Sequence, residues 1–154
     1  MSRLIGVDHG SRRIGLAVGD TETGMAFARG ARRRTNERDD LAALVALADA
    51  EGAERFVIGL PLLEDGSEGE QSARARAFGT RLAAVTERSV VYTDERNTSW
   101  QARTDLDAAG RRPSRATGEL DSAAARLILQ QYLDDLAGRG HAGSDPHPIT
   151  EEPA

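Results

Sequence analysis

The stretch RLIGVDHGSRRIGLAVGD, residues 3–20, decides the fold of this chain. Its two short apolar runs, LIGV and IGLAV, are separated by the turn-forming segment HGSRR. This pattern is typical of two β-strands joined by a tight turn. The first run ends at a carboxylate, Asp8, directly before the turn, and the stretch therefore raises the question of what that carboxylate does.

Length and composition limit the kind of protein. With 154 residues the chain is long enough for one domain with a real core. It has no cysteine, which argues against disulfides and thiolate metal sites, and no run approaches the roughly 20 apolar residues of a membrane span. No signal-peptide pattern opens the sequence, so a cytoplasmic location is the expectation. The formal net charge is −5, but residues 140–154 contain three acidic residues and no arginine, so the rest of the chain is less acidic.

Periodicity predicts alternating strands and helices after the opening hairpin. Three strands, a helix and a strand come first, followed by helix, strand, helix and a final long helix. A tail rich in Gly, Pro and Ser is predicted to be disordered beyond residue 137. The predicted strands cover residues 3–8, 12–19, about 24–29, 56–60 and 90–92, and the predicted helices cover 39–51, about 70–85 (opened by a capping box at Ser67), about 98–109 and 120–137.

This order of elements predicts an α/β domain over residues 1–137, with a mixed five-stranded sheet flanked by helices. The first three strands form an antiparallel meander. Strands one, four and five run parallel, because a crossover helix precedes each of the later strands.

Three carboxylates are predicted to converge at one edge of this sheet. Asp8 and Glu95 follow the ends of parallel strands, where ligand sites of open α/β sheets form. Asp121 shares a helical face with Ala125, Ile128 and Tyr132, so it is predicted to face inward. Three carboxylates in one partly buried place would repel one another unless a divalent cation neutralised them, and Mg²⁺ or Mn²⁺ suits all-oxygen ligands.

Each carboxylate also has a simpler interpretation. Asp8 could form a turn, Glu95 could pair with a surface arginine, and Asp121 could cap a helix. Two other residues of the opening stretch are set aside. Asp20 would lie about 20 Å from Asp8 across the hairpin, and it is predicted to support the next turn. The histidine after Asp8, His9, is predicted to be a turn residue.

The sequence resembles the YqgF family of RuvX-like proteins, described as pre-16S rRNA nucleases and as Holliday junction resolvase-like. Four blocks carry the resemblance, in the family's order, within residues 3–136: GVDHGSRRIGLAVGD, FVIGLPLLEDGSEGEQ, VVYTDER and ELDSAAARLILQQYL. The resemblance implies a ribonuclease H-like fold, with Asp8, Glu95 and Asp121 as the acidic active-site and metal-binding positions. The chain departs from the family at Glu119, near a position where lysines are common, and at Asn97, where an apolar residue is usual.

The chemistry that the resemblance implies is phosphodiester hydrolysis assisted by one or two divalent ions. Affinity for nucleic acid would come mainly from arginines that contact phosphates. The turn after Asp8 and a basic patch before the first helix are the best candidates, whereas Arg74, Arg81 and Arg88, at seven-residue spacing, are expected to be solvated. The predicted nucleic-acid-binding residues are Arg12, Arg13, Arg32, Arg33, Arg34 and Arg96.

Three functions remain open at this point. The leading one is a nuclease that processes the 5′ end of pre-16S rRNA in ribosome biogenesis. The second is a Holliday junction resolvase, which would require a homodimer to cut two strands symmetrically. The third is a non-catalytic nucleic-acid-binding module linked to transcription.

Overall fold

The computed structural model describes residues 2–94, 118–142 and 149–150 of the chain. The helix predicted over residues 98–109 lies outside these ranges. The elements are β1 (Arg3–His9), β2 (Arg13–Asp20), β3 (Ala26–Arg33), α1 (Glu37–Glu51), β4 (Ala53–Leu60), α2 (Glu70–Val85), β5 (Ser89–Asp94), α4 (Glu119–Ala142) and β6 (Ile149–Thr150).

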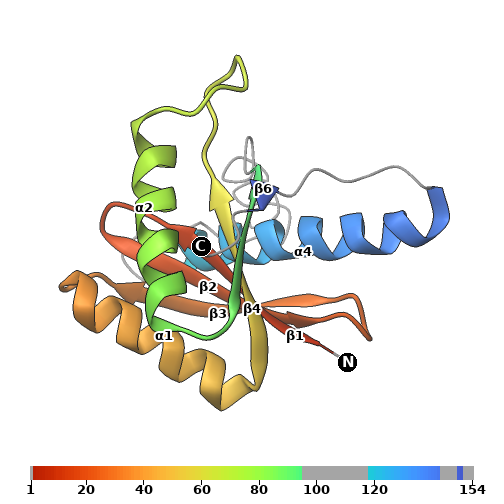
Figure 1. Ribbon diagram of the computed structural model, residues 1–154, viewed down its shortest axis with the longest axis horizontal. Coiled ribbons are helices and arrows are strands. Elements are labelled where there is room, and N and C mark those ends of the chain that lie inside the picture. Colours follow the sequence, from red (N-terminus) through yellow and green to blue (C-terminus); the bar gives the residue numbers. More distant parts are fainter. Residues whose placement is uncertain (1, 95–117, 143–148, 151–154) are drawn as a thin grey trace.

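The described strands form one mixed sheet in the order β3-β2-β1-β4-β5-β6, as Figure 1 shows. β2 is antiparallel to both β1 and β3, whereas β1, β4 and β5 run parallel. The predicted five-stranded mixed sheet is therefore confirmed. The two-residue strand β6 adds an antiparallel edge next to β5.

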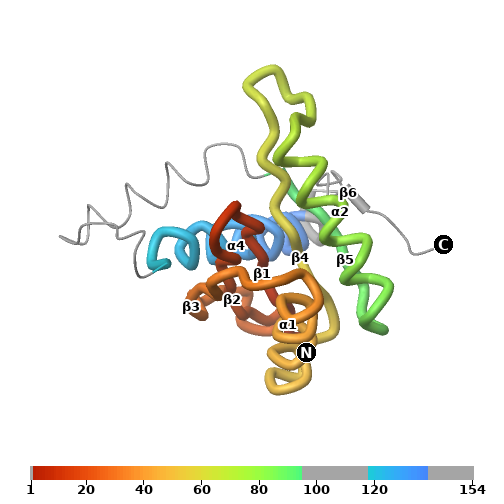
Figure 2. The backbone as a smooth tube through the Cα atoms, turned by 90° about the vertical axis from the view of Figure 1, so that its left-hand side faces the viewer, coloured from red at the N-terminus to blue at the C-terminus, as the bar shows by residue number. Residues whose placement is uncertain are grey.

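Helices cover the two faces of the sheet unequally, with α4 on one face and α1 and α2 on the other (Figures 1 and 2). Side chains of a strand alternate between the faces. Ile5 and Val7 of β1 pack in the core beneath α1 and α2, together with Phe78. Leu4 packs in the second core, beneath α4, together with Ile128. The even-numbered residues of β1 therefore face α4, and this parity decides where Asp8 points.

Several boundaries differ from the predicted ones. β3 continues to Arg33, so most of the basic patch expected before the first helix belongs to this strand. Helix α4 continues to Ala142, five residues beyond its predicted end. Residues 143–148 and 151–154 of the predicted disordered tail lie outside the described ranges, so that prediction stays open.

The predicted capping box at Ser67 is wrong. Gly69 is the N-cap residue of α2 and makes no side-chain capping bond. The Ser67 hydroxyl instead donates to Asp65 Oδ1 at 2.6 Å, and its main-chain N–H donates to the same oxygen. Asp65 therefore outcompetes the helix end for the serine, because a carboxylate two residues away is already in reach.

In the described part of the chain, no helix combines the length and the apolar character that crossing a membrane requires.

Candidate active site

Asp8 lies one residue before the end of β1, on the face of the sheet that α4 covers. Its parity with Leu4 places it there, and its Cα partner on β2 is Gly15. Directly opposed residues of an antiparallel pair point to the same face, about 5 Å apart. The half-buried Asp8 carboxyl and the vacant side-chain position of Gly15 are therefore neighbours under the start of α4.

Gly15 lets α4 approach this spot closely. A Cβ built on Gly15 would lie 2.0 Å from the carbonyl oxygen of Asp121, a distance that no real side chain allows. The main chain of Asp121 thus lies directly over Gly15 and beside Asp8. The structure brings together these two predicted site residues, which are far apart in the sequence.

Asp121 has the orientation that its spacing predicts. Ala125, Ile128 and Tyr132, which share its helical face, are buried in the core beneath α4. Asp121 itself is half-buried in the first turn of α4, where the rim of that core meets solvent. Carboxylates in a first turn are also favoured by the helix dipole.

Sequence reasoning missed Ser122, which fixes the start of α4 on the sheet. Its hydroxyl is buried, accepts the N–H of Gly30 at 2.8 Å and donates to the carbonyl of Leu16 at 3.2 Å. The N–H of Gly30 and the carbonyl of Leu16 are available to Ser122 because a bulge interrupts the β2–β3 ladder here. At this bulge Leu16 lies opposite both Arg29 and Gly30, and Gly30 has a φ of 83°. Ser122 therefore joins α4 to two strands at the residue next to Asp121.

Glu95, the third predicted carboxylate, lies outside the described residues. Within the described ranges, no three acidic or histidine side chains form a group that could hold a metal ion. Asp8 and Asp121 do offer oxygen donors on adjoining positions at a half-buried corner, and hard divalent cations prefer such donors. The chemistry of this pair fits Mg²⁺ or Mn²⁺ and requires a further ligand.

His9 is not the turn residue that the sequence predicts. It is the last residue of β1, and its ring packs on Phe78 of α2 with the ring centroids 4.5 Å apart. Burial, with a further contribution from the nearby Arg34 guanidinium, lowers the pKa of His9 to about 4. Its Nε2 atom is buried and has no hydrogen-bond partner among the described residues. His9 is therefore neutral near pH 7 and packs on the face opposite Asp8.

Asp20 supports the next turn, as predicted. It lies opposite Arg3 in the β1–β2 register, at the far end of the hairpin, and its Oδ1 accepts a hydrogen bond from the main-chain N–H of Thr23 at 2.7 Å. These hydrogen bonds hold the pKa of the exposed Asp20 carboxyl below its usual value.

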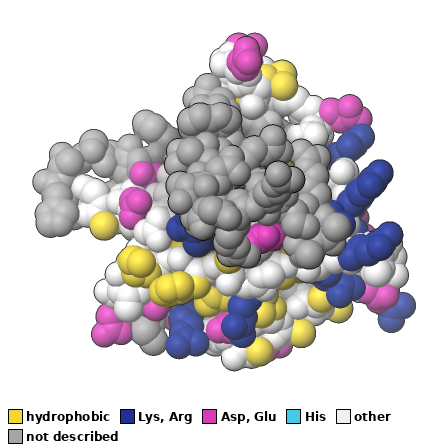
Figure 3. Space-filling model, turned by 180° about the vertical axis from the view of Figure 1, so that it is seen from behind, with side chains coloured by type: hydrophobic (Ala, Val, Ile, Leu, Met, Phe, Trp, Pro, Cys, Tyr) yellow, Lys and Arg dark blue, Asp and Glu magenta, His cyan; other side chains and the backbone are white. Residues whose placement is uncertain are grey.

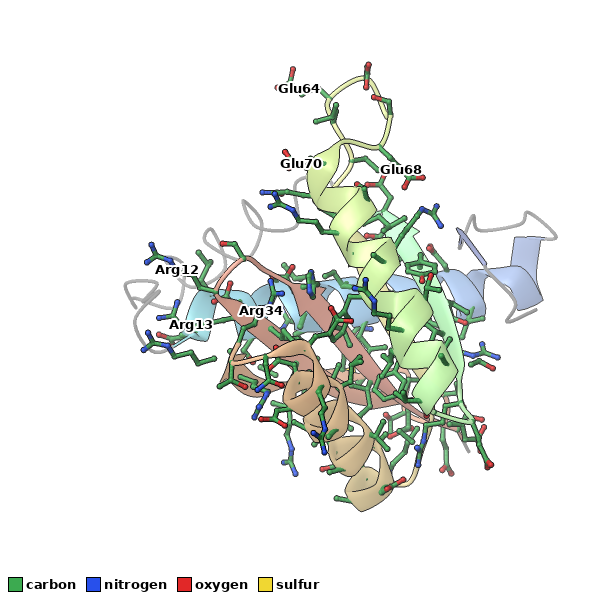
Figure 4. The ribbon with its side chains drawn as sticks, turned by 60° about the vertical axis from the view of Figure 1, so that its left-hand side comes forward. Arg12, Arg13, Arg34, Glu64, Glu68 and Glu70 are labelled. Carbon is green, nitrogen blue, oxygen red and sulfur yellow. The ribbon has the colours of Figure 1, made fainter. Side chains whose placement is uncertain are left out.

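Arg12 and Arg13 lie at the tip of the β1–β2 hairpin (Figure 4), within three residues of Gly15, the β2 partner of Asp8. Arg12 is exposed, and Arg33 at the end of β3 is exposed too. Neither of these two residues has an ion pair with another described residue. The aliphatic part of Arg13 packs beside Gly118, since a Cβ on that glycine would lie 3.3 Å from Arg13 Cδ. The predicted phosphate-binding residues Arg12, Arg13 and Arg33 thus share one corner.

Arg32 and Arg34 bind a carboxylate of the chain itself. Arg32 Nε lies 3.1 Å from Oδ1 of Asp40, and Arg34 Nε lies 3.9 Å from its Oδ2. Arg96, the last predicted nucleic-acid ligand, lies outside the described residues.

Of the three arginines at positions 74, 81 and 88, which were expected to be solvated, only the first two lie on α2. Arg88 follows the end of α2 and bonds to Asp49 and to the carbonyl of Ala53. Arg74 pairs with Glu70, and Arg81 pairs with Glu37. These three guanidinium groups are neutralised on the protein surface.

The fold is of the ribonuclease H-like class, as its likeness to solved structures shows. Thermus thermophilus RuvC bound to a Holliday junction substrate superimposes with a TM-score of 0.60 at 13% identity, covering 97% of this chain and 100% of that one. A Fowlpox virus resolvase in complex with Holliday junction DNA gives a TM-score of 0.54 at 10% identity, covering 87% of this chain and 98% of that one. At such identities the likeness concerns the fold alone.

The chain belongs to the RuvX family, described as Holliday junction resolvase, whose family model matches residues 2–135. A relative from a Synechococcus species is 40% identical over 147 residues, covering 93% of this chain and 96% of the relative. Another, from Anaeromyxobacter dehalogenans, is 42% identical over 135 residues, covering 88% of this chain and 98% of the relative. Both carry the name "Putative pre-16S rRNA nuclease". The resemblance found in the four sequence blocks is thereby confirmed.

Proposed function

We propose that this protein is a divalent-metal-dependent nuclease that hydrolyses phosphodiester bonds in structured nucleic acid and processes the 5′ end of pre-16S rRNA in the cytoplasm. The observation that carries the proposal is the meeting of Asp8 and Asp121 at one corner, where the main chain of α4 lies directly on Gly15. The names of the relatives support the choice of substrate.

In this proposal Asp8, Asp121 and Glu95 are the metal ligands. Glu95 directly follows Asp94, the last residue of β5, which ends at the same edge of the sheet as β1. A bound Mg²⁺ or Mn²⁺ would polarise the scissile phosphate and lower the pKa of the attacking water. The protein's own contribution is to hold its carboxylates in place before substrate arrives, and both Gly15 and Ser122 serve that purpose.

The arginines around the hairpin tip would bind the substrate. Arg12 and Arg13 lie at the hairpin tip (Figure 4), Arg33 is the β3 partner of Arg13, and Arg96 follows Glu95 directly in sequence. Guanidinium groups bind phosphate oxygens in pairs, which fixes the strand as well as attracting it. Arg32 and Arg34 stay candidates, although each already shares its charge with Asp40.

A Holliday junction resolvase is the second candidate function, because the family description names this activity. It would require two copies of the chain, since a junction is resolved by paired cuts in two strands. A monomer in gel filtration at micromolar concentration would count against it. A non-catalytic nucleic-acid-binding module, the third candidate, would bind nucleic acid without any need for Mg²⁺ or Mn²⁺.

The decisive experiment offers a pre-16S leader RNA and a four-way DNA junction in parallel, each with Mg²⁺, with Mn²⁺ or with chelator. Wild type is compared with Asp8→Asn and with Asp20→Asn, a control that alters a carboxylate at the opposite end of the same hairpin. We expect metal-dependent cleavage of the RNA by wild type and by Asp20→Asn, and none by Asp8→Asn. If Asp8→Asn cuts as well as wild type, the proposed site is wrong.

A further inference from the structure

The first turn of α1 contains a buried carboxylate, Asp40, that the proposed chemistry does not use. Only 1% of its surface is exposed. Its Oδ1 accepts hydrogen bonds from Arg32 Nε at 3.1 Å and from the main-chain N–H of Thr35 at 3.2 Å. A buried charge is retained only when it is paired and hydrogen-bonded, and Asp40 meets both conditions through the segment that links β3 to α1.

Arg34 connects Asp40 to the β1–β2 turn (residues 10–12). Its Nη1 donates to the carbonyl of Gly10 at 3.0 Å and reaches the carbonyl of Ser11 at 3.4 Å, while its Nε faces Asp40. The main-chain N–H of Arg34 donates to the carbonyl of Arg12 at 2.8 Å. Three successive carbonyls of the turn are therefore bound by this one residue. In Figure 4, Arg34 lies inward of Arg12 and Arg13, toward α1.

The turn held in this way adjoins the proposed active site on both sides. Asp8 lies two residues before Gly10, and the exposed Arg12 extends from the turn itself. A turn that protrudes from a sheet has few contacts of its own, so the bonds from Arg34 decide how precisely it is held.

We propose that Asp40 is a positioning residue that acts through Arg34 to hold the β1–β2 turn, and with it Arg12 and Asp8, in the geometry that binds substrate phosphates. This proposal rests on the proposed nuclease function. It assigns Arg34 to the protein's own turn and not to the substrate.

Arg32 provides a matched control. It binds the same carboxylate of Asp40, through Oδ1 where Arg34 faces Oδ2, and carries the same charge as Arg34, but its described hydrogen bonds go to Asp40 and Thr35 and none goes to the turn. Arg32→Met and Arg34→Met therefore each remove one positive charge and one partner of Asp40. They differ in whether the turn loses its support.

Asp40→Asn separates positioning from direct phosphate binding by the sign of its effect. The variant removes a negative charge and releases Arg34, so direct binding of phosphate by Arg34 would lower the KM for nucleic acid. If Arg34 instead supports the turn, its release raises KM, because Arg12 is no longer held in place. A purely structural role would lower kcat through loss of folded protein and leave KM unchanged.

The test measures steady-state cleavage of pre-16S leader RNA and, independently, hydrogen exchange of the Gly10 amide, which donates to the carbonyl of Arg13 at 2.9 Å. We expect Asp40→Asn and Arg34→Met to raise KM about tenfold or more and to speed exchange at Gly10, whereas Arg32→Met leaves the exchange rate at Gly10 as in wild type. A lower KM for Asp40→Asn, or equal exchange rates at Gly10 in Arg32→Met and Arg34→Met, would overturn the inference. Wild type that cleaves no nucleic acid overturns the proposed function instead, and the exchange rates still decide whether the Asp40–Arg34 pair holds the turn.

Discussion

Gly15 is the residue on which the candidate site depends most directly, because the main chain of Asp121 occupies the place of its side chain. Gly15→Ala would put a methyl group 2.0 Å from the Asp121 carbonyl oxygen. Since main-chain atoms cannot swing aside as a side chain does, α4 must move. We expect a loss of about 1–3 kcal/mol in the free energy of unfolding, measured by urea denaturation, and a large loss of cleavage.

Gly138→Ala is the control for this substitution. Gly138 is itself a residue of α4, but a Cβ built on it would have no atom within 4 Å. Alanine is the better helix former, so this variant should gain about 0.5–1 kcal/mol. If Gly15→Ala unfolds at the same urea concentration as wild type and cleaves normally, Asp121 is not held against Gly15.

His9 makes the stability of the metal-free protein depend on pH. Burial and the neighbouring Arg34 and Arg74 lower its pKa to about 4, and Asp40 opposes them only in part. The unfolded chain binds a proton near pH 6.5, so it takes up protons before the folded state does. The stability that the neutral, packed His9 contributes to the folded protein is therefore complete above about pH 6.5 and is lost as the pH falls toward 4.

We expect wild type to lose about 1–2 kcal/mol more than His9→Phe between pH 7 and pH 5, a value reduced for the partial exposure of His9. Phenylalanine keeps an aromatic ring against Phe78 and does not titrate. Urea denaturation with chelator present at both pH values measures the difference. Parallel pH profiles for the two proteins would show that His9 does not titrate as its burial implies.

At this scale, the sequence could predict the residues whose direction follows from regular geometry. The position of Asp8 at the end of a parallel strand and the spacing of Asp121 along its helix predicted that these two residues lie near each other. Asp40 and Ser122 could not be found in this way, because their partners come from other elements and no local pattern marks them. The prediction that His9 is a turn residue was wrong for the same reason. Its ring packs on Phe78 of α2, a contact between elements that no local pattern shows.

Among the elements, α4 depends on Ser122 for its position over the sheet. Ser122→Ala leaves the N–H of Gly30 and the carbonyl of Leu16 without this partner at the β2–β3 bulge. We expect a loss of about 1–3 kcal/mol in the free energy of unfolding, together with slower cleavage because the adjacent Asp121 is less well held.

The matched control is Thr80→Ala on α2. Its hydroxyl also donates to a main-chain carbonyl, that of Arg76, but Thr80 is exposed, so water can replace it. We expect a change of about 0.5 kcal/mol or less. Equal effects of the two variants on unfolding and cleavage would mean that the bulge contact does not position α4.

The existence and order of the described elements from β1 to α4 could be predicted from apolar runs and turn residues, whereas the two-residue strand β6 could not. The ends of the elements could not be predicted either. β3 continues through Arg29, Arg32 and Arg33 because it is an edge strand that pairs with β2 on one side and exposes much of its other surface, where charged side chains are tolerated. Such a segment looks like a basic loop until its pairing partner is known.

Over the whole molecule, the placement of charge matters more than its sum. The chain has 20 arginines and 25 acidic residues. On α2 and around it, arginines are paired: Arg74 with Glu70, Arg76 with Glu68 and Arg81 with Glu37. Figure 3 shows arginine side chains gathered along one edge, and Figure 4 shows Glu64, Glu68 and Glu70 at the start of α2 and in the loop before it, apart from Arg12 and Arg13 at the hairpin tip. A polyanion is therefore expected to approach through the hairpin corner.

This charge distribution predicts which arginines determine the salt dependence of nucleic-acid binding. Each phosphate contact contributes about 0.7 for single strands, or 0.9 for duplexes, to the slope of the logarithm of the binding constant against that of the salt concentration. The double variant Arg12→Ala/Arg33→Ala should therefore reduce the slope by about 1.4–1.8.

The double variant Arg74→Ala/Arg81→Ala is the control. It removes the same charge from already paired sites and should leave the slope unchanged, because Glu70 and Glu37 already neutralise those guanidinium groups. Fluorescence anisotropy titrations of a labelled RNA, with chelator present to prevent cleavage, measure both slopes. If both double variants reduce the slope by the same amount relative to wild type, only the net charge of the protein attracts the substrate, and the hairpin corner is not its binding surface.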